Sequence, residues 1–289
     1  MKLSMYRRFE RRELLVMIKT YLFRSSLNLS TLFLWGLHHS HMRLICFFKQ
    51  GCFNDDLKVP QFKKRGFAIL GKVNSNLSEC TTHINELFLK EPTKKYMDLP
   101  KTADPIISSF VFNALTDFSG HIQSVLHSHF QTYWIQIYKT SPGENESSSS
   151  FAWHQDADPP SMHKIFIYMN DVTSRNGAFR TFDRQISKKL FKNGFISNNP
   201  ENRIKSQKLI TKELLCFSNW IEGPAGTISI FDNNLIHRGT YPEEGFRIVI
   251  SIEKYPSNKQ IDFANVQNSL SMPVTDDFPN NPYVNKYLN

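Results

Sequence analysis

The spacing of apolar residues divides the chain into a helix-rich first half and a strand-rich second half. Apolar residues recur at helical spacing over 5–24, 77–89 and 106–129, and Gln61 to Leu70 has the pattern of a helix end, a glycine turn and a short strand. Farther along, short runs rich in β-branched and aromatic residues are separated by Gly, Pro and Asn turns, which is typical of strands. These runs are 132–139, 164–169, 178–182, 227–232 and 247–252. The pattern predicts a mainly β fold with flanking helices, in which the strands form a sandwich or an open barrel.

Two polar segments stand apart from this pattern. Residues 184–222 are rich in Lys, Asn and Ser, with helical patterning from Ile204 to Leu215, and an insertion of this size between strands commonly covers a site as a lid. The residues from Pro256 onward are polar and rich in Pro and Asn, so they are expected to be irregular. We therefore expect three regions, which are a basic, partly helical extension at 1–50, a folded domain at 51–255 and an irregular tail at 256–289.

The positive charge of the chain is concentrated at its N-terminus. The formal net charge is +9, and residues 1–50 hold nine Lys and Arg against two Glu, a local net charge of +7. Because only +2 remains for all other residues, the body offers no basic stripe for a nucleic-acid backbone. The basic segment is compatible with weak peripheral contact with an anionic membrane surface, although a helix packed on the domain is the simpler interpretation. A start at Met42 would remove most of this segment.

The cysteines and the N-terminal apolar run bear on the cellular compartment. The four cysteines show neither CxxC pairing nor metal-finger spacing, which favours a reducing environment. The apolar run from Leu14 to Ile18 is followed by Lys19 and Arg24 and by no small-residue cleavage site, so it makes a poor secretory signal. We therefore expect a cytoplasmic protein, and its oligomeric state is left open.

The first chemical signal follows a polar loop. Residues 151–156 read Phe-Ala-Trp-His-Gln-Asp, which sets the imidazole of His154 two positions before the carboxylate of Asp156. Two positions apart on a strand, both side chains point to the same face, as a shared metal ion requires. A His-x-Asp tripeptide alone is a weak signal, so the interpretation depends on further ligands elsewhere in the chain.

Two residues far downstream complete the pattern. In a barrel, His237 would meet His154 and Asp156 at one mouth, and two imidazoles with one carboxylate are the ligand set of non-haem Fe(II) oxygenases. This set leaves coordination positions open for a bidentate 2-oxo acid and O2. Arg247 opens a strand between Phe246 and Ile248. A guanidinium there is suited to hold the far carboxylate of a dicarboxylate co-substrate by paired, charge-assisted hydrogen bonds.

At these residues the chain resembles the phytanoyl-CoA dioxygenase-like branch of the Fe(II)/2-oxoglutarate oxygenases, which includes ectoine hydroxylases. The resemblance covers about residues 59–255 and leaves the first 50 residues and the C-terminal tail unmatched. The matched pieces are Phe151-x-Trp153-His154-x-Asp156, the strand Ile165 to Asn170 with Asp171 and Asn176-Gly177, the segment Gly226 to Asp232 leading to His237-Arg238-Gly239, and Arg247.

The resemblance implies a double-stranded β-helix, or jelly roll, flanked by helices. It also implies that His154, Asp156 and His237 ligate Fe(II) and that Arg247 binds the distal carboxylate of 2-oxoglutarate. In the family reaction 2-oxoglutarate is decarboxylated to succinate and CO2 while O2 is used to hydroxylate the substrate. The expected activity is therefore that of a dioxygenase acting on a small-molecule or lipid-like metabolite.

Three further residues are expected near the co-substrate. Phe151 and Lys164 fall where family members place secondary contacts to 2-oxoglutarate, and Gln136, on the strand before the motif, is expected to face the pocket.

One departure from the family concerns the substrate side. Relatives commonly follow the Asn-Gly turn with Gly-Ser-His, whereas residues 179–184 here read Phe-Arg-Thr-Phe-Asp-Arg, so the substrates of relatives are not carried over. The carboxylate of Asp156 speaks against the halogenating variants, which lose it. Two alternatives remain, a catalytically silent jelly-roll binding module and a cupin-like metalloenzyme that uses another divalent metal. Hydrolysis by the latter would give no reason for a carboxylate anchor at Arg247.

Overall fold

The computed structural model describes residues 37, 40–46, 48, 59–90, 96–97, 104–142, 149–156, 162–197 and 200–270. The helix expected over 5–24 and the end of the chain after residue 270 lie outside these residues, and the expectations for them stay predictions. Among the described helices, none is both long enough and apolar enough to cross a membrane.

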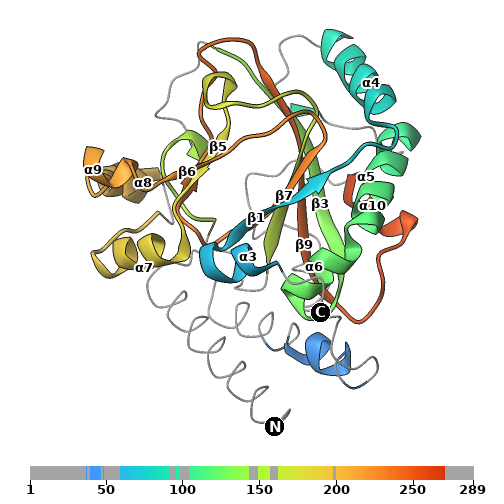
Figure 1. Cartoon of the computed structure of the whole chain (residues 1–289), viewed down its shortest axis with the longest axis horizontal. Coiled ribbons are helices and arrows are strands. Elements are labelled where there is room, and N and C mark those ends of the chain that lie inside the picture. The colour runs from blue at the N-terminus through green and yellow to red at the C-terminus, as the bar shows by residue number, and fades with distance from the viewer. Residues whose placement is uncertain are drawn as a thin grey trace.

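Two antiparallel sheets form the centre of the domain (Figure 1). The larger sheet has the strand order β1-β7-β4-β9-β3-β2, and the smaller sheet has the order β6-β5-β8. The five strands predicted in the second half of the chain and the short strand predicted before Leu70 are all present. The strands of the larger sheet are β1 (Phe67–Lys72), β2 (Tyr96–Met97), β3 (His129–Thr140), β4 (His163–Tyr168), β7 (Thr227–Asp232) and β9 (Arg247–Ser257), and those of the smaller sheet are β5 (Phe179–Thr181), β6 (Asn219–Ile221) and β8 (His237–Arg238).

The two sheets share an apolar core. Phe166 and Tyr168 of β4 and Phe231 of β7 pack together with Phe179 of β5 and Ile221 of β6. Because successive side chains of a strand point to opposite faces, the intervening residues of β4 and β7 face away from the smaller sheet. The space between the sheets is therefore lined by every second residue of each strand.

Helices cover the outer face of the larger sheet (Figure 1). Ile84, Phe110 and Ile122 from three of these helices pack in one cluster with sheet residues such as Ile250. The apolar spacing that predicted helices over 77–89 and 106–129 is thus the spacing of their buried faces. The helices are α4 (Leu77–Lys90), α5 (Pro105–Asp117), α6 (Ser119–Leu126) and α10 (Phe263–Leu270).

Helix α10 corrects the expectation that the chain is irregular from Pro256 onward. Strand β9 continues to Ser257, and α10 then buries Val266 and Leu270, which lie one turn apart. The side-chain amide of Asn265 accepts from the backbone N–H of Thr132 and donates to its carbonyl oxygen, where the pairing of β3 with β9 shifts register. The helix was not predicted because the residues from Pro256 onward were judged by their average composition. Most of the prolines in this segment lie after residue 270 and so do not interrupt the helix.

The insertion predicted at 184–222 contains three helices on the side of the domain away from α4, α5 and α10 (Figure 1). They are α7 (Arg184–Lys192), α8 (Pro200–Gln207) and α9 (Lys212–Leu215). The single helical pattern expected over 204–215 is thus divided between α8 and α9. Thr211 causes the division, because its side chain accepts a hydrogen bond from the backbone N–H of Leu214 and begins a new helix.

Lys254 of β9 is a buried amine on the helix-covered face of the larger sheet. It is fully buried, and its Nζ has no hydrogen-bond partner among the described residues. Burial, followed by repulsion from Arg43, holds the pKa of Lys254 well below its usual range. Between the lowered pKa of the folded state and the pKa of an unfolded lysine, the unfolded chain binds a proton here that the folded chain does not, so this residue makes stability rise with pH over that range.

We expect Lys254→Met to raise the free energy of unfolding at pH 7 by about 1–3 kcal/mol, since it removes a buried donor without a partner. The gain over the wild type should shrink as the pH rises toward about 10, the ordinary pKa of lysine. Urea unfolding at pH 7 and pH 9.5 measures both effects, with Lys188→Met on the exposed face of α7 as the control. A less stable Lys254→Met variant would contradict this reasoning.

Candidate metal centre

The segments that carry His154 and His237 are paired through their backbones. The N–H of His154 donates to the carbonyl oxygen of His237 at 2.9 Å, and the N–H of His237 donates to that of His154 at 2.8 Å. Side chains that are directly opposite in an antiparallel pair lie close together on one face. The ring centroids are accordingly 4.3 Å apart. The structure thus brings together the two imidazoles that the sequence predicted as ligands.

Each imidazole is oriented by a carbonyl group of its own segment. Nδ1 of His154 lies 2.8 Å from the carbonyl oxygen of Ala152, and Nδ1 of His237 lies 2.8 Å from that of Leu235. Because a carbonyl oxygen only accepts, Nδ1 is the donor in both contacts, and in a neutral ring this arrangement leaves the lone pair of Nε2 for a metal ion. Burial, followed by the proximity of His237, lowers the pKa of His154 to about 4, so this ring is neutral near pH 7.

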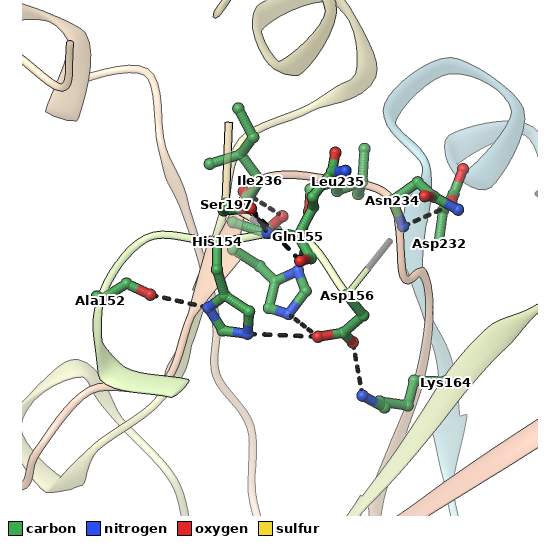
Figure 2. Close-up of polar contacts among 12 residues, drawn as sticks. Ala152, His154, Gln155, Asp156, Lys164, Ser197, Asp232, Asn234, Leu235 and Ile236 are labelled. Carbon is green, nitrogen blue, oxygen red and sulfur yellow. Dashed lines mark hydrogen bonds and ion pairs between the residues drawn. The ribbon is translucent and has the colours of Figure 1, made fainter. Parts of the chain in front are cut away.

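Asp156 lies against both rings, and Figure 2 shows it between His154 and Lys164. Its Oδ1 is 3.3 Å from Nε2 of His154 and 3.5 Å from Nε2 of His237. Burial opposes ionisation of this carboxyl group, but the Lys164 ammonium and then His237 hold the pKa of Asp156 well below its usual range. The donor atoms of the triad, His154, Asp156 and His237, lie within 4.8 Å of one another, so they are able to hold a metal ion.

Lys164 supports the carboxylate of the triad. Its Nζ lies 2.6 Å from Oδ2 of Asp156 and 3.0 Å from Oε1 of Glu253. Glu253 is the cross-strand partner of Lys164 in the pairing of β4 with β9, and it accepts a further hydrogen bond from the hydroxyl group of Tyr133. The contact of Lys164 with a co-substrate stays a prediction.

The insertion holds the backbone on both sides of His154. The side-chain amide of Gln207 in α8 accepts from the backbone N–H of Trp153 at 3.0 Å and donates to its carbonyl oxygen at 2.9 Å. The hydroxyl oxygen of Ser197 accepts from the backbone N–H of Gln155 at 2.9 Å. The segment predicted as a lid therefore acts as a scaffold for the motif, and its role as a cover for the pocket stays a prediction.

Arg247 is a buried cation at the start of β9, with 2% of its surface exposed. Its Nη1 donates to the carbonyl oxygen of Gly177 and its Nη2 to Oγ1 of Thr140 at 3.3 Å, while Nε has no hydrogen-bond partner among the described residues. Gly177 has φ of +95°, and a Cβ there would lie 2.9 Å from the carbonyl oxygen of Thr240, which explains the Asn-Gly turn seen in the sequence. Both of these hydrogen bonds of the guanidinium therefore end on neutral groups.

An aromatic wall, formed by Tyr138, Phe166 and Phe179, connects Arg247 to the triad. The Arg247 guanidinium carbon lies 5.7 Å from the ring centroid of Tyr138, which is 6.4 Å from that of Phe166. Phe166 is in turn 5.1 Å from Phe179, and Phe179 is 5.2 Å from the ring of His237. The predicted anchor and the predicted metal ligands thus line one interior.

Gln136 and Phe151 occupy different surroundings. Gln136 is opposite Ser251 in the pairing of β3 with β9, so it lies on the same face of the sheet as Arg247. It is 8% exposed and its Nε2 has no hydrogen-bond partner among the described residues, which leaves a donor for a ligand. The ring of Phe151 stacks on Tyr241 with centroids 3.7 Å apart. Contacts of both residues with a co-substrate stay predictions.

Sequence reasoning missed the residues that support the triad. Glu253 had a detectable signal, because it is an acidic residue in register with Arg247 on a strand that otherwise looks apolar. Gln207 and Ser197 had none, since polar residues in a polar insertion resemble ordinary surface residues.

Comparisons with known proteins support the fold. No family model matches the sequence, and no curated protein sequence matches it. EctD from S. alaskensis with bound Fe is 12% identical, with 78% of this chain and 87% of that chain covered and a TM-score of 0.51. HygX from Streptomyces hygroscopicus with nickel and 2-oxoglutarate bound is 16% identical, with 72% and 89% covered and a TM-score of 0.48. Identities this low bear on the fold alone. The predicted jelly roll with flanking helices is confirmed, and the chain shares this fold with the iron-bound EctD.

Proposed function

We propose that this protein is an Fe(II)- and 2-oxoglutarate-dependent dioxygenase that hydroxylates a small-molecule or lipid-like metabolite with formation of succinate and CO2. The observation that carries the proposal is the presence, in one interior, of the triad and of the buried guanidinium of Arg247. A triad alone serves many metal-dependent reactions. A triad joined to a carboxylate anchor is what a 2-oxo dicarboxylate needs.

The donor set fits Fe(II). Two imidazole nitrogens and one carboxylate oxygen converge, and the Nδ1 of each histidine is turned to a carbonyl group, which leaves Nε2 for the metal. The described residues supply three ligands at this place, whereas a structural zinc site has four protein ligands. The remaining positions would be open to a co-substrate and O2. The bound iron of EctD, which has the same fold, is consistent with this choice of metal.

Arg247 fits the co-substrate. A buried guanidinium with only neutral hydrogen-bond partners is costly, and a ligand carboxylate would supply the missing charge through two parallel hydrogen bonds. A cupin-like hydrolase that uses another metal would have no use for this anchor. A silent binding module would have no use for open metal positions.

The residues of the chain have distinct tasks in this proposal. Bound iron, 2-oxoglutarate and O2 would supply the oxidising chemistry, which no side chain can provide. His154 and His237 supply nitrogen ligands, and Asp156 supplies the negative charge that partly balances the metal. Arg247 orients the co-substrate, and the aromatic wall keeps water out of the interior.

Anaerobic addition of Fe(II) and 2-oxoglutarate to the apoprotein is expected to produce the visible charge-transfer band of the chelate. His237→Ala removes a nitrogen ligand and should abolish the band, whereas the control His121→Ala on α6 should retain it. The proposal fails if the wild type gives no band or if the band of His237→Ala is undiminished. Succinate formation under air then measures turnover.

Arg247→Met is expected to weaken 2-oxoglutarate binding by roughly 100-fold, because about 3 kcal/mol of charge-assisted hydrogen bonding is lost. Arg247→Lys should recover only part of this loss, since an ammonium cannot form the paired contact. Titration of 2-oxoglutarate into the Fe(II)-loaded protein without O2 measures the affinity, and Co(II) titration checks that metal binding is retained. An unchanged affinity for 2-oxoglutarate would remove Arg247 from its assigned role.

Gln207→Ala is expected to weaken Co(II) binding by roughly tenfold, because it releases the backbone next to His154 from α8. The matched control is Gln185→Ala on the exposed face of α7, which should bind Co(II) as the wild type does. Equal Co(II) affinity for the two variants would show that the insertion does not position the triad.

A further inference from the structure

The two carboxylate oxygens of Asp156 have different surroundings. Oδ1 lies near both imidazoles, 3.3 Å from Nε2 of His154 and 3.5 Å from Nε2 of His237. Oδ2 points away from them and accepts a hydrogen bond from Nζ of Lys164 at 2.6 Å (Figure 2). A single oxygen of Asp156 therefore faces the place where the two nitrogen donors converge.

Lys164 is held from its other side by the larger sheet. Its Nζ lies 3.0 Å from Oε1 of Glu253, and Tyr133 donates to Oε2 of the same carboxylate. Lys164 and Glu253 are side by side on β4 and β9, and the side chain of Glu253 is 5% exposed. The ammonium is thus fixed by a buried pair on a rigid sheet, which leaves it little freedom to leave Asp156.

The ammonium of Lys164 does not serve to attract the metal. A positive charge in contact with a ligand carboxylate repels a divalent cation and lowers the electron density that the carboxylate can offer. Removal of the ammonium would also free Oδ2. A carboxylate with both oxygens free is able to bind a metal through both and so to occupy an additional coordination position.

We propose that Lys164 is a positioning residue that restricts Asp156 to one-oxygen coordination and so keeps the positions open that the 2-oxo acid requires. Glu253 and Tyr133 act through Lys164 by holding its ammonium in place. This inference rests on the proposed function, because it concerns the same metal centre and co-substrate. It predicts that metal affinity and co-substrate affinity change independently.

The test compares Lys164→Met with Lys164→Arg and with the exposed control Lys188→Met. Co(II) affinity is measured by absorption titration, and 2-oxoglutarate affinity is measured by the charge-transfer band of the Fe(II)-loaded protein without O2. Lys164→Met should bind Co(II) at least as tightly as the wild type and bind 2-oxoglutarate roughly 10- to 100-fold more weakly. Lys164→Arg, which keeps a donor to both carboxylates, should restore most of the 2-oxoglutarate affinity, and Lys188→Met should match the wild type.

The outcomes separate this inference from the proposed function. If the wild type shows no charge-transfer band, the proposed function is wrong. If the wild type shows a normal band and Lys164→Met binds 2-oxoglutarate as tightly as the wild type, only the role of Lys164 is wrong. Loss of Co(II) binding together with 2-oxoglutarate binding would also overturn it, because that is the result of general damage to the site. If Lys164→Met does not fold in a thermal unfolding assay, Glu253→Gln takes its place. Unchanged 2-oxoglutarate affinity in Glu253→Gln would then overturn the inference.

Discussion

The backbone pairing of His154 with His237 is the interaction on which the candidate site depends. Metal ligands must meet within a few ångströms, and these two come from segments that are far apart in the sequence. The reciprocal N–H to carbonyl hydrogen bonds of the bridge satisfy buried backbone groups and set both imidazoles on the same face. The same carbonyl contact at each Nδ1 then leaves both Nε2 atoms directed at Asp156.

The rest of the interior is organised by the period-two alternation of β9. Arg247, Ser251 and Glu253 fall on one face of this strand, so the proposed carboxylate anchor and a support for the proposed metal ligands are built on the same rigid element. Two cations lie on this face of the larger sheet, the buried Arg247 on β9 and the partly buried Lys164 on β4, and they differ in their partners. Lys164 is balanced by two carboxylates, whereas the hydrogen bonds that Arg247 donates to Gly177 and Thr140 end on neutral oxygens. This difference is the reason to assign a charged ligand to Arg247 and a supporting role to Lys164.

Much of the fold and the triad followed from local features of the sequence. Strands and flanking helices have hydrophobic periods that depend only on neighbouring residues, so their patterns survive without knowledge of the tertiary structure. The turn at Gly177 requires a positive φ and was visible as Asn-Gly. Arg247 was recognised as a candidate carboxylate anchor because it opens a strand between apolar residues. Helix α10 was not predicted, because the polar composition of the whole tail indicated irregular structure and only two apolar positions one turn apart indicated a helix.

By itself, then, the sequence determined most of the strands and flanking helices, and it supplied the triad and the carboxylate anchor at Arg247 as hypotheses. Only the tertiary structure decided what supports them. Glu253 pairs with Lys164 and accepts a hydrogen bond from Tyr133, and Gln207 holds the backbone next to His154. All of these contacts join segments that are remote in sequence. Such polar pairs leave no periodic signal, because each member alone resembles a surface residue. Their partners are selected by the register of β4 with β9 and by the packing of α8 on the motif, and these are properties of the folded chain.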